Sequence, residues 1–276
     1  MNPPLHRYAI FVVVLALAAV VTGAIITSTG VAARQMQSAV SPIIGQTLHR
    51  TLSLALTLFA LGLATWTSRS PVGGWLRAVA WSAMATLAID AALGSQTPWL
   101  PAKVAVFHAL LAHVFLSLAA AIAVGTSARW NRPPELVDGS HKPFLRALAV
   151  AIPPVIFLQI TLGAAYRHDM TSVMPHMVVA MGVAFLALIG SSVALQNFPR
   201  PAPMRHAAAG LISLVLTQVC LGIGAFVMLV LNSAGTLYFV AVSAGHVVIG
   251  ASTLAASVVM AMEVRRSVLP KQRSPL

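Results

Sequence analysis

The sequence predicts an all-α integral membrane protein with eight transmembrane helices. Three observations support this fold class: 58% of the 276 residues are hydrophobic, only 8% are charged, and the apolar residues form eight long runs. Five acidic residues could not keep a globular domain of this composition soluble. A collagenous or disordered chain would contain far more glycine, proline or charge. Function is therefore expected inside the membrane.

The eight runs are separated by short connections that carry most of the charged residues. A spanning helix needs about 20 apolar residues, and each run approaches or exceeds that length. The first run is interpreted as a retained span rather than a signal peptide, because it is longer than a typical signal sequence and only one basic residue precedes it. The predicted spans are 8–29, 47–66, 76–94, 104–125, 145–166, 172–193, 207–231 and 237–262.

The 17 Lys and Arg residues, against five Asp and Glu, give a net charge of +12. These cations are spread over the ends of the runs, where they can contact anionic lipid, and do not cluster as in a nucleic-acid-binding surface. Because cytoplasmic loops are enriched in Lys and Arg, their asymmetry predicts that both termini are cytoplasmic. The cytoplasmic side receives Arg7, Arg69, Arg77, Arg129, Arg132, Lys142, Arg146, Arg200, Arg205, Arg265, Arg266, Lys271 and Arg273, and the outer side receives Arg34, Arg50, Lys103 and Arg167.

The chain is predicted to consist of two pseudo-repeated four-helix bundles. The longest cytoplasmic connection contains Arg132-Pro133-Pro134-Glu135, which divides the chain into a half at 1–130, a linker at 131–144 and a half at 145–276. A polar residue followed four positions later by glycine recurs near the outer ends of odd-numbered helices, on one helix face. Ordinary packing of small residues is the alternative explanation. The occurrences are Asp90 with Gly94, Gln159 with Gly163 and Gln218 with Gly222, and Gly23 has the matching place in the first helix.

Four of the nine histidines lie in the first turns of the even-numbered helices: His49, His108, His176 and His246. The predicted topology puts all four near the outer face, two in each half. Ionisable groups within spans usually line an interior site. Two imidazoles at matched depth on two helices are typical of the axial ligands of a haem in a four-helix bundle. Zinc or copper would usually recruit a third ligand, so one haem in each half is the simpler prediction.

The other histidines are assigned to different roles. His113 follows His108 by five residues, about 140° around the helix, so a structural role is expected. His168 lies in an outer loop, where it could contact a haem propionate or water. His6, His141 and His206 are expected in solvated cytoplasmic loops.

Three further polar residues accompany the predicted haem sites. Arg50 and Arg167 each lie beside one site, where a guanidinium suits a propionate, although simple placement at the membrane interface explains them equally well. Asp90 is the only acidic residue inside a predicted run. It is interpreted either as a proton relay or substrate contact, or as a packing residue that is hydrogen-bonded to a neighbouring helix. The single Cys220 excludes an intramolecular disulfide and a CxxC motif, so redox chemistry would require a bound cofactor.

Taken together, these residues resemble the haem A synthase family of cytochrome oxidase assembly proteins over nearly the whole chain. The resemblance rests on the duplicated eight-helix layout and on the combined spacing of several short motifs. It implies an integral membrane oxidoreductase, located in the cytoplasmic membrane if the source is bacterial, that converts the C8 methyl of haem O to the formyl group of haem A, with water supplying the aldehyde oxygen. The motifs are Gln46-x-x-His49-Arg50, Gln159-Ile-Thr-Leu-Gly163 with Tyr166-Arg167-His168, Pro175-His176 and Gly245-His246.

The resemblance also implies a role for each pair of histidines and a set of partners. His176 and His246 would bind a haem b cofactor near the outer face, and His49 and His108 would ligate the substrate haem O, of which a haem O synthase is one source. An unidentified electron acceptor and membrane lipid are the other partners. A homo-oligomer is compatible with the sequence.

Gln46 departs from the family pattern, which has Glu at this position. An amide cannot accept a proton as a carboxylate does, so Asp90 is a hypothetical substitute, and both are candidate catalytic residues. The external Cys pair of some members is also missing. The alternative function is therefore a non-catalytic dihaem b protein for electron transfer or haem binding. A repeat-built transporter is less compatible, because interrupted helices and a midplane site would be expected.

Overall fold

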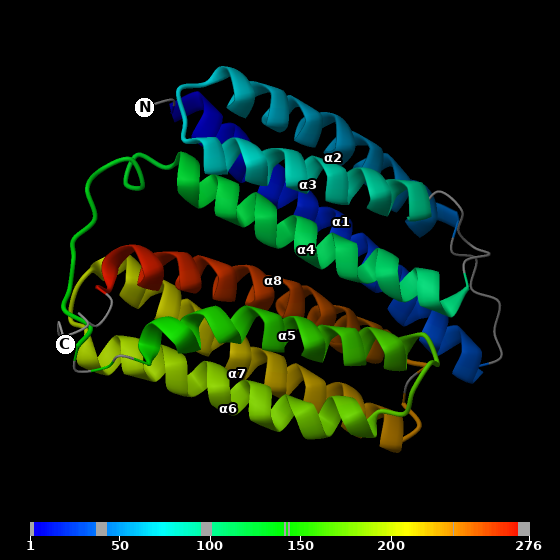
Figure 1. Ribbon diagram of the computed structural model, residues 1–276. Helices are drawn as coiled ribbons and strands as arrows, with labels where there is room; N and C mark the ends of the chain where they lie inside the picture. Colours follow the sequence, from blue (N-terminus) through cyan, green and yellow to red (C-terminus); the bar gives the residue numbers. More distant parts are fainter. Residues whose placement is uncertain are drawn as a thin grey trace.

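The computed structural model describes residues 3–36, 43–94, 101–140, 142, 144–233 and 235–269. These residues form eight α-helices and no strand, which confirms the predicted all-helical class (Figure 1), and each helix is long and apolar enough to cross a membrane. The helices are α1 (Pro3–Met36), α2 (Ile43–Arg69), α3 (Gly74–Gly94), α4 (Ala102–Thr126), α5 (Leu145–Arg167), α6 (Met174–Asn197), α7 (Ala202–Val230) and α8 (Leu237–Ser267).

Each predicted run overlaps one helix, and the differences lie at the ends. The apolar pattern stops at the first polar residues, whereas the backbone hydrogen bonds continue into the more polar turns beyond them. His6 and His206 therefore lie in α1 and α7 rather than in the loops where they are expected. His141, Lys271 and Arg273 lie outside the described residues.

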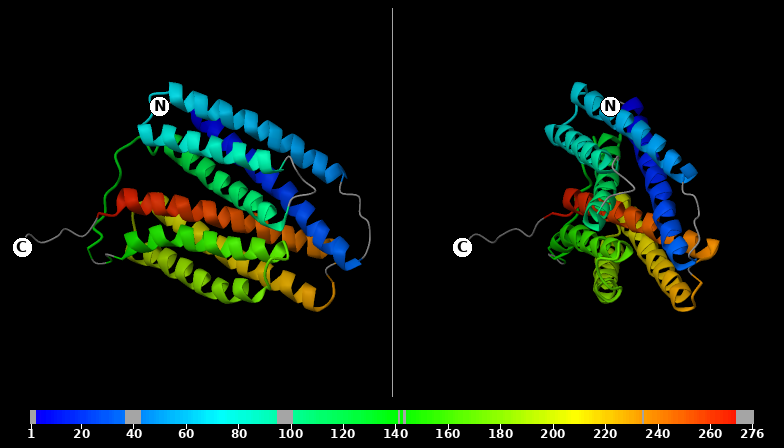
Figure 2. Two further views of the ribbon diagram at one scale, coloured as in Figure 1. Left: turned by 45° about the vertical axis from the view of Figure 1, so that its right-hand side comes forward. Right: turned by 90° about the vertical axis from the view of Figure 1, so that its right-hand side faces the viewer.

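The helices make two groups of four. In the first, α1 contacts α2 and α4, and α3 contacts both α2 and α4; in the second, α5 contacts α6 and α8, and α7 contacts both α6 and α8. Contacts of α8 with α1 and α4, and of α4 with α5, join the groups. Figure 2 shows the two groups packed against each other, with α4 of the first group in contact with α8 of the second.

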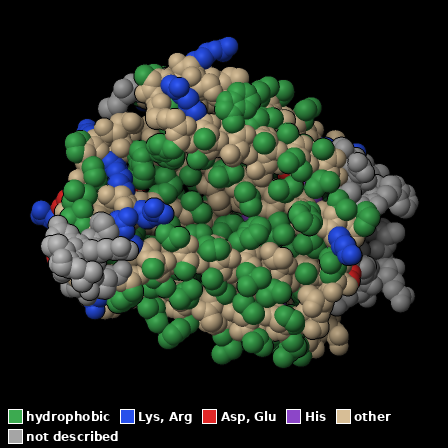
Figure 3. Space-filling view, in the orientation of Figure 1, with side chains coloured by type: hydrophobic (Ala, Val, Ile, Leu, Met, Phe, Trp, Pro, Cys, Tyr) green, Lys and Arg blue, Asp and Glu red, His purple; other side chains and the backbone are tan. Residues whose placement is uncertain are grey.

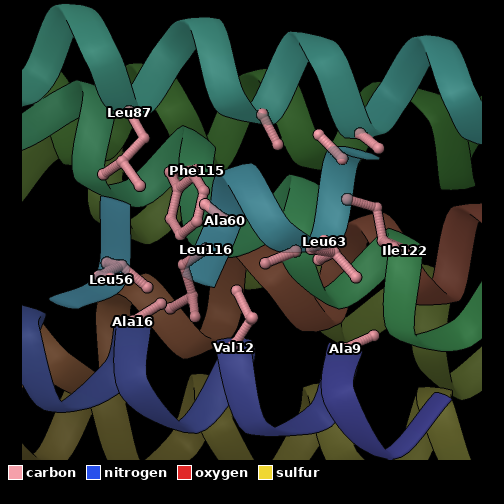
Figure 4. Close-up of a cluster of buried hydrophobic side chains, with 14 of the residues drawn as sticks. Ala9, Val12, Ala16, Leu56, Ala60, Leu63, Leu87, Phe115, Leu116 and Ile122 are labelled. Carbon is pink, nitrogen blue, oxygen red and sulfur yellow. The ribbon is translucent and has the colours of Figure 1, made fainter. Parts of the chain in front are cut away.

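Small and branched apolar side chains fill the centre of the first group (Figure 4). Alanines such as Ala9, Ala16 and Ala60 are buried there, which allows the helix backbones to approach closely, while Phe115 and Leu116 of α4 fill the remaining space. A second buried cluster joins α5, α6, α7 and α8. Each group therefore has its own core.

The outer surface has the distribution that a bilayer requires. Figure 3 shows apolar side chains over the middle of one face, with Lys and Arg side chains near its two ends. Large apolar residues such as Leu54, Phe185 and Ile223 are exposed on the sides of the helices. In water such a surface would be unfavourable, but in hydrocarbon it is the expected one.

An ion pair with a buried carboxylate joins the two groups where the even-numbered helices end. Arg129, just after α4, bonds Glu263 of α8 through two nitrogens, at 3.0 and 2.5 Å. The Glu263 side chain is 2% exposed and that of Arg129 is 43% exposed. Because α8 continues beyond the predicted end of the run at Met262, Glu263 also lies within a helix, near the end that is predicted to be cytoplasmic.

The linker is bound to this same end of the molecule. Val137 donates its backbone N–H to the Ser267 carbonyl at 2.9 Å, and the Arg266 guanidinium lies 4.5 Å from the centre of the Trp130 ring. His6, near the start of α1, contacts Thr126 at the end of α4 at 3.3 Å. The start of α1 and the ends of α4 and α8 therefore lie at one end of the bundle (Figure 1).

Candidate functional site

The four histidines meet as two pairs. In the first pair, His49 of α2 and His108 of α4 have ring centres 6.3 Å apart and ring planes at 88°. In the second pair, His176 of α6 and His246 of α8 have ring centres 6.1 Å apart and planes at 82°. Each pair lies within one group of four helices and near the end where the even-numbered helices begin. The partners that the sequence predicts are thus brought together.

Each imidazole packs against a glycine of the preceding helix. A Cβ atom added at Gly23 would lie 3.1 Å from Cε1 of the His49 ring. At the other three positions the Cβ would lie closer still to the facing ring, at 2.8 to 2.9 Å from Cε1, so glycine is the only residue that fits without displacing the histidine. These three anchor glycines are Gly94 against His108, Gly163 against His176 and Gly222 against His246.

The same close approach gives each ring a backbone hydrogen-bond partner. Nδ1 of each histidine lies 3.1 to 3.2 Å from the carbonyl oxygen of the residue four positions before the glycine. Because a carbonyl oxygen only accepts, these bonds assign the hydrogen to Nδ1 and leave the lone pair on Nε2 at His49, His108 and His246, while at His176 the Gln159 amide N–H competes for Nδ1. A metal-ligating histidine is typically oriented by a hydrogen bond of this kind. The anchor carbonyls belong to Ala19, Asp90, Gln159 and Gln218, in the order of the histidines.

The side chains around the first pair are a hydroxyl and a carboxylate. Oγ1 of Thr22 lies 3.0 Å from Nδ1 of His49. Oδ1 of Asp90 lies 2.8 Å from Nδ1 of His108. The carboxylate oxygen has no well-directed hydrogen bond, because the ring N–H points to the Asp90 carbonyl, so the carboxylate acts on the imidazole through its charge and its proximity. Asp90 is buried, with 7% of its surface exposed.

The side chains around the second pair are two amides. Nε2 of Gln159 lies 2.9 Å from Nδ1 of His176 and donates to the His176 carbonyl, also at 2.9 Å. Nε2 of Gln218 lies 3.2 Å from Nε2 of His246, so the amide N–H points to the lone pair that a metal would use. The amide oxygens of both glutamines are buried without a hydrogen-bond partner.

Three other predicted residues lie next to the histidines in sequence or space. Gln46 is half-buried one turn before His49, on the same face of α2. Arg50 follows His49 directly and is exposed. Asp90 contacts the ring of His108, and so lies against a candidate ligand.

Arg167 joins the two groups of helices at the end that holds the histidine pairs. One guanidinium nitrogen donates to Ser243 of α8 at 2.8 Å, and the other donates to Thr27 and Ser28 of α1 at 2.8 and 3.0 Å. Arg167 thus links α1, α5 and α8. Its contact with a propionate stays a prediction. His168 forms the C-terminal cap of α5 and is half-buried.

His113 is separate from the first pair. It is buried in α4, and its Nδ1 bonds the carbonyl of Ala109 in the same helix at 2.6 Å. Among the described residues, no three His, Cys, Asp or Glu side chains gather as metal ligands.

Two features of the site are not predicted from the sequence. The anchor carbonyls belong to the backbone and have no residue-type signature, although the polar-x-x-x-Gly spacing marks their positions. Thr22 is one of many hydroxyl residues in the spans, and its place directly before Gly23 is the signal that could have indicated it.

None of the known protein-family models matches this sequence, and no curated protein matches it. The residues and their geometry are therefore the basis for assigning a function.

Proposed function

We propose that this protein is a haem-binding membrane oxidoreductase of the haem A synthase type, which converts the C8 methyl of haem O to a formyl group for cytochrome oxidase assembly. The observation that carries the proposal is the pairing of four histidines, each with Nδ1 bonded to a backbone carbonyl. The motif pattern that resembles the family supports the particular reaction.

The separation of the rings supports haem as the bound group. A metal–imidazole bond of about 2 Å, plus about 1 Å from the nitrogen to the ring centre, separates two opposite ligands by about 6 Å. The observed 6.3 and 6.1 Å agree with this value. A porphyrin supplies four metal ligands itself, so two histidines complete the set. Haem bound there would supply one-electron chemistry.

The chain's own residues hold and orient the group. The anchor carbonyls fix Nδ1–H, and the anchor glycines allow each ring to lie close to its neighbouring helix. His176 and His246 would hold the haem b cofactor, and His49 and His108 would hold the substrate haem O. At the second pair the Gln218 amide would have to turn away from Nε2 of His246 to admit the metal.

The proposed orientation follows from the charges. Most Lys and Arg residues lie where α1 begins and the even-numbered helices end, so this end would face the cytoplasm, together with both termini. Both haem sites would then lie near the outer face. The two groups of four helices would be structural repeats, because both carry the same glycine, carbonyl and histidine arrangement.

The proposal is tested by extracting haem from the protein after co-expression with a haem O source, and by recording the pyridine haemochrome spectrum. Haem A beside haem b is the expected result. Substitution of His176 or His246 should remove the haem b signal. An unchanged visible spectrum in these variants would exclude the synthase function and haem b binding at this pair alike.

A second candidate function is a dihaem b protein that transfers electrons or holds haem without chemical conversion. Gln46 favours this function, because its amide cannot act as a general base. Haem b alone, with haem O left unconverted, would support this second function. Formation of haem A would show that Gln46 is compatible with catalysis.

A further inference from the structure

The two histidine pairs share their backbone geometry but differ in the charge beside it. All four Nδ1 atoms bond an anchor carbonyl at nearly the same distance. The side chain of the anchor residue is a carboxylate only at Asp90, next to His108, and it is an amide at both positions of the second pair. A comparison of the pairs therefore isolates one negative charge.

We propose that Asp90 is a positioning residue that holds the reduction potential of a haem at the first pair below that of a haem at the second pair. This inference rests on the proposed function, since it requires haem at both pairs. A carboxylate 2.8 Å from Nδ1 makes the imidazole a stronger donor and favours the more highly charged ferric iron.

Burial makes this charge effective. Asp90 is 7% exposed, so little water screens its carboxylate from the His108 ring. The neutral amides of Gln159 and Gln218 are also buried but provide no comparable field. Thr22, at the other histidine of the first pair, contributes a neutral hydroxyl. The charges near the rings are thus the Asp90 carboxylate, in direct contact with His108, and the more distant Arg167 guanidinium, which acts on His246.

The anchor carbonyl allows the charge to be changed without releasing the ring. In Asp90→Asn the side chain keeps its size, and the main-chain oxygen that accepts from His108 is still present. Gln159→Glu is the reciprocal change at the second pair, because the Gln159 amide lies at Nδ1 of His176 as the Asp90 carboxylate lies at Nδ1 of His108. Asp138→Asn is the control, because it removes one carboxylate from an exposed linker position at the other end of the molecule.

The experiment is a potentiometric titration of the full chain in detergent, loaded with haem B. Each site is assigned in a variant that retains only one pair, His246→Ala or His108→Ala. We expect Asp90→Asn to shift the first site to a more positive potential and Gln159→Glu to shift the second site to a more negative one, with no shift in Asp138→Asn. The electron paramagnetic resonance spectrum of the ferric first site should change in Asp90→Asn as well.

The outcomes separate the two proposals. If the wild type binds no haem B, the proposed function fails, and this inference fails with it. If haem B binds at both sites but neither reciprocal variant moves its potential, the proposed function stands and the role of Asp90 is refuted. If Asp90→Asn only empties the first site, an unshifted second site in Gln159→Glu would also overturn the inference.

Discussion

The first and second histidine pairs show how one backbone arrangement can support two chemical environments. Both pairs have rings about perpendicular to each other, a glycine against each ring and a carbonyl at each Nδ1. At the first pair the nearby side chains are Thr22 and Asp90, and at the second they are Gln159 and Gln218. Ring orientation is therefore separable from the polarity around the ring.

Removal of one ligand should have the largest effect and would show whether the pairs are independent. We expect His176→Ala to lose about one of two bound haems, and His49→Ala to lose the other, because each pair lies within its own group of helices. The haem content per protein, measured after purification, checks this. If either variant emptied both sites, the pairs would have to be treated as one coupled unit.

Changes in the ion pair between Arg129 and Glu263 test whether the two histidine pairs depend on the contact between the two groups of helices. Arg129→Ala should destabilise the protein by about 2–3 kcal/mol, because it leaves the buried Glu263 carboxylate without its partner, while the exposure of Arg129 reduces the strength of the lost pair. Glu263→Gln should cost less, since the remaining Arg129 is partly exposed. Thermal unfolding in detergent measures which of the two substitutions lowers the stability more. An equal effect of both substitutions would contradict the burial argument.

The anchor glycines provide a smaller and more local test. Gly94→Ala, Gly163→Ala and Gly222→Ala should each destabilise the protein by about 1–3 kcal/mol and weaken haem binding at the facing histidine only, because the Cβ overlaps the ring. Gly182→Ala and Gly210→Ala are matched controls with nothing near the added Cβ, and should gain up to about 1 kcal/mol. Haem retention during thermal unfolding distinguishes the two sets.

Gly23→Ala should give the smallest effect and sharpens the comparison within the first pair. Its Cβ would lie 3.1 Å from the His49 ring, against 2.8 Å for Gly94 and His108. A shift of a few tenths of an ångström relieves the contact at Gly23, so we expect a loss of about 1 kcal/mol or less. An effect as large as that of Gly94→Ala, measured in the same unfolding assay, would disprove this ranking.

The fold class was predictable because each span is a nearly uninterrupted apolar run with charge at its ends. The end of α8 was not, since Glu263 interrupts the apolar pattern although its charge is satisfied by Arg129. The pairing of the four histidines was predictable from their matched depth on the even-numbered helices. The contact of Asp90 with His108 was not, because the register between α3 and α4 depends on packing that periodicity does not contain.

The anchor carbonyls have a consequence for how such a protein can evolve. In a helix each of these oxygens also accepts the N–H of the residue four positions later, which is the glycine, so its two lone pairs serve the helix and the histidine together. A main-chain acceptor is not removed by a point mutation. Selection can therefore exchange Ala, Asp or Gln at these positions, as in this chain, while the imidazole keeps its direction.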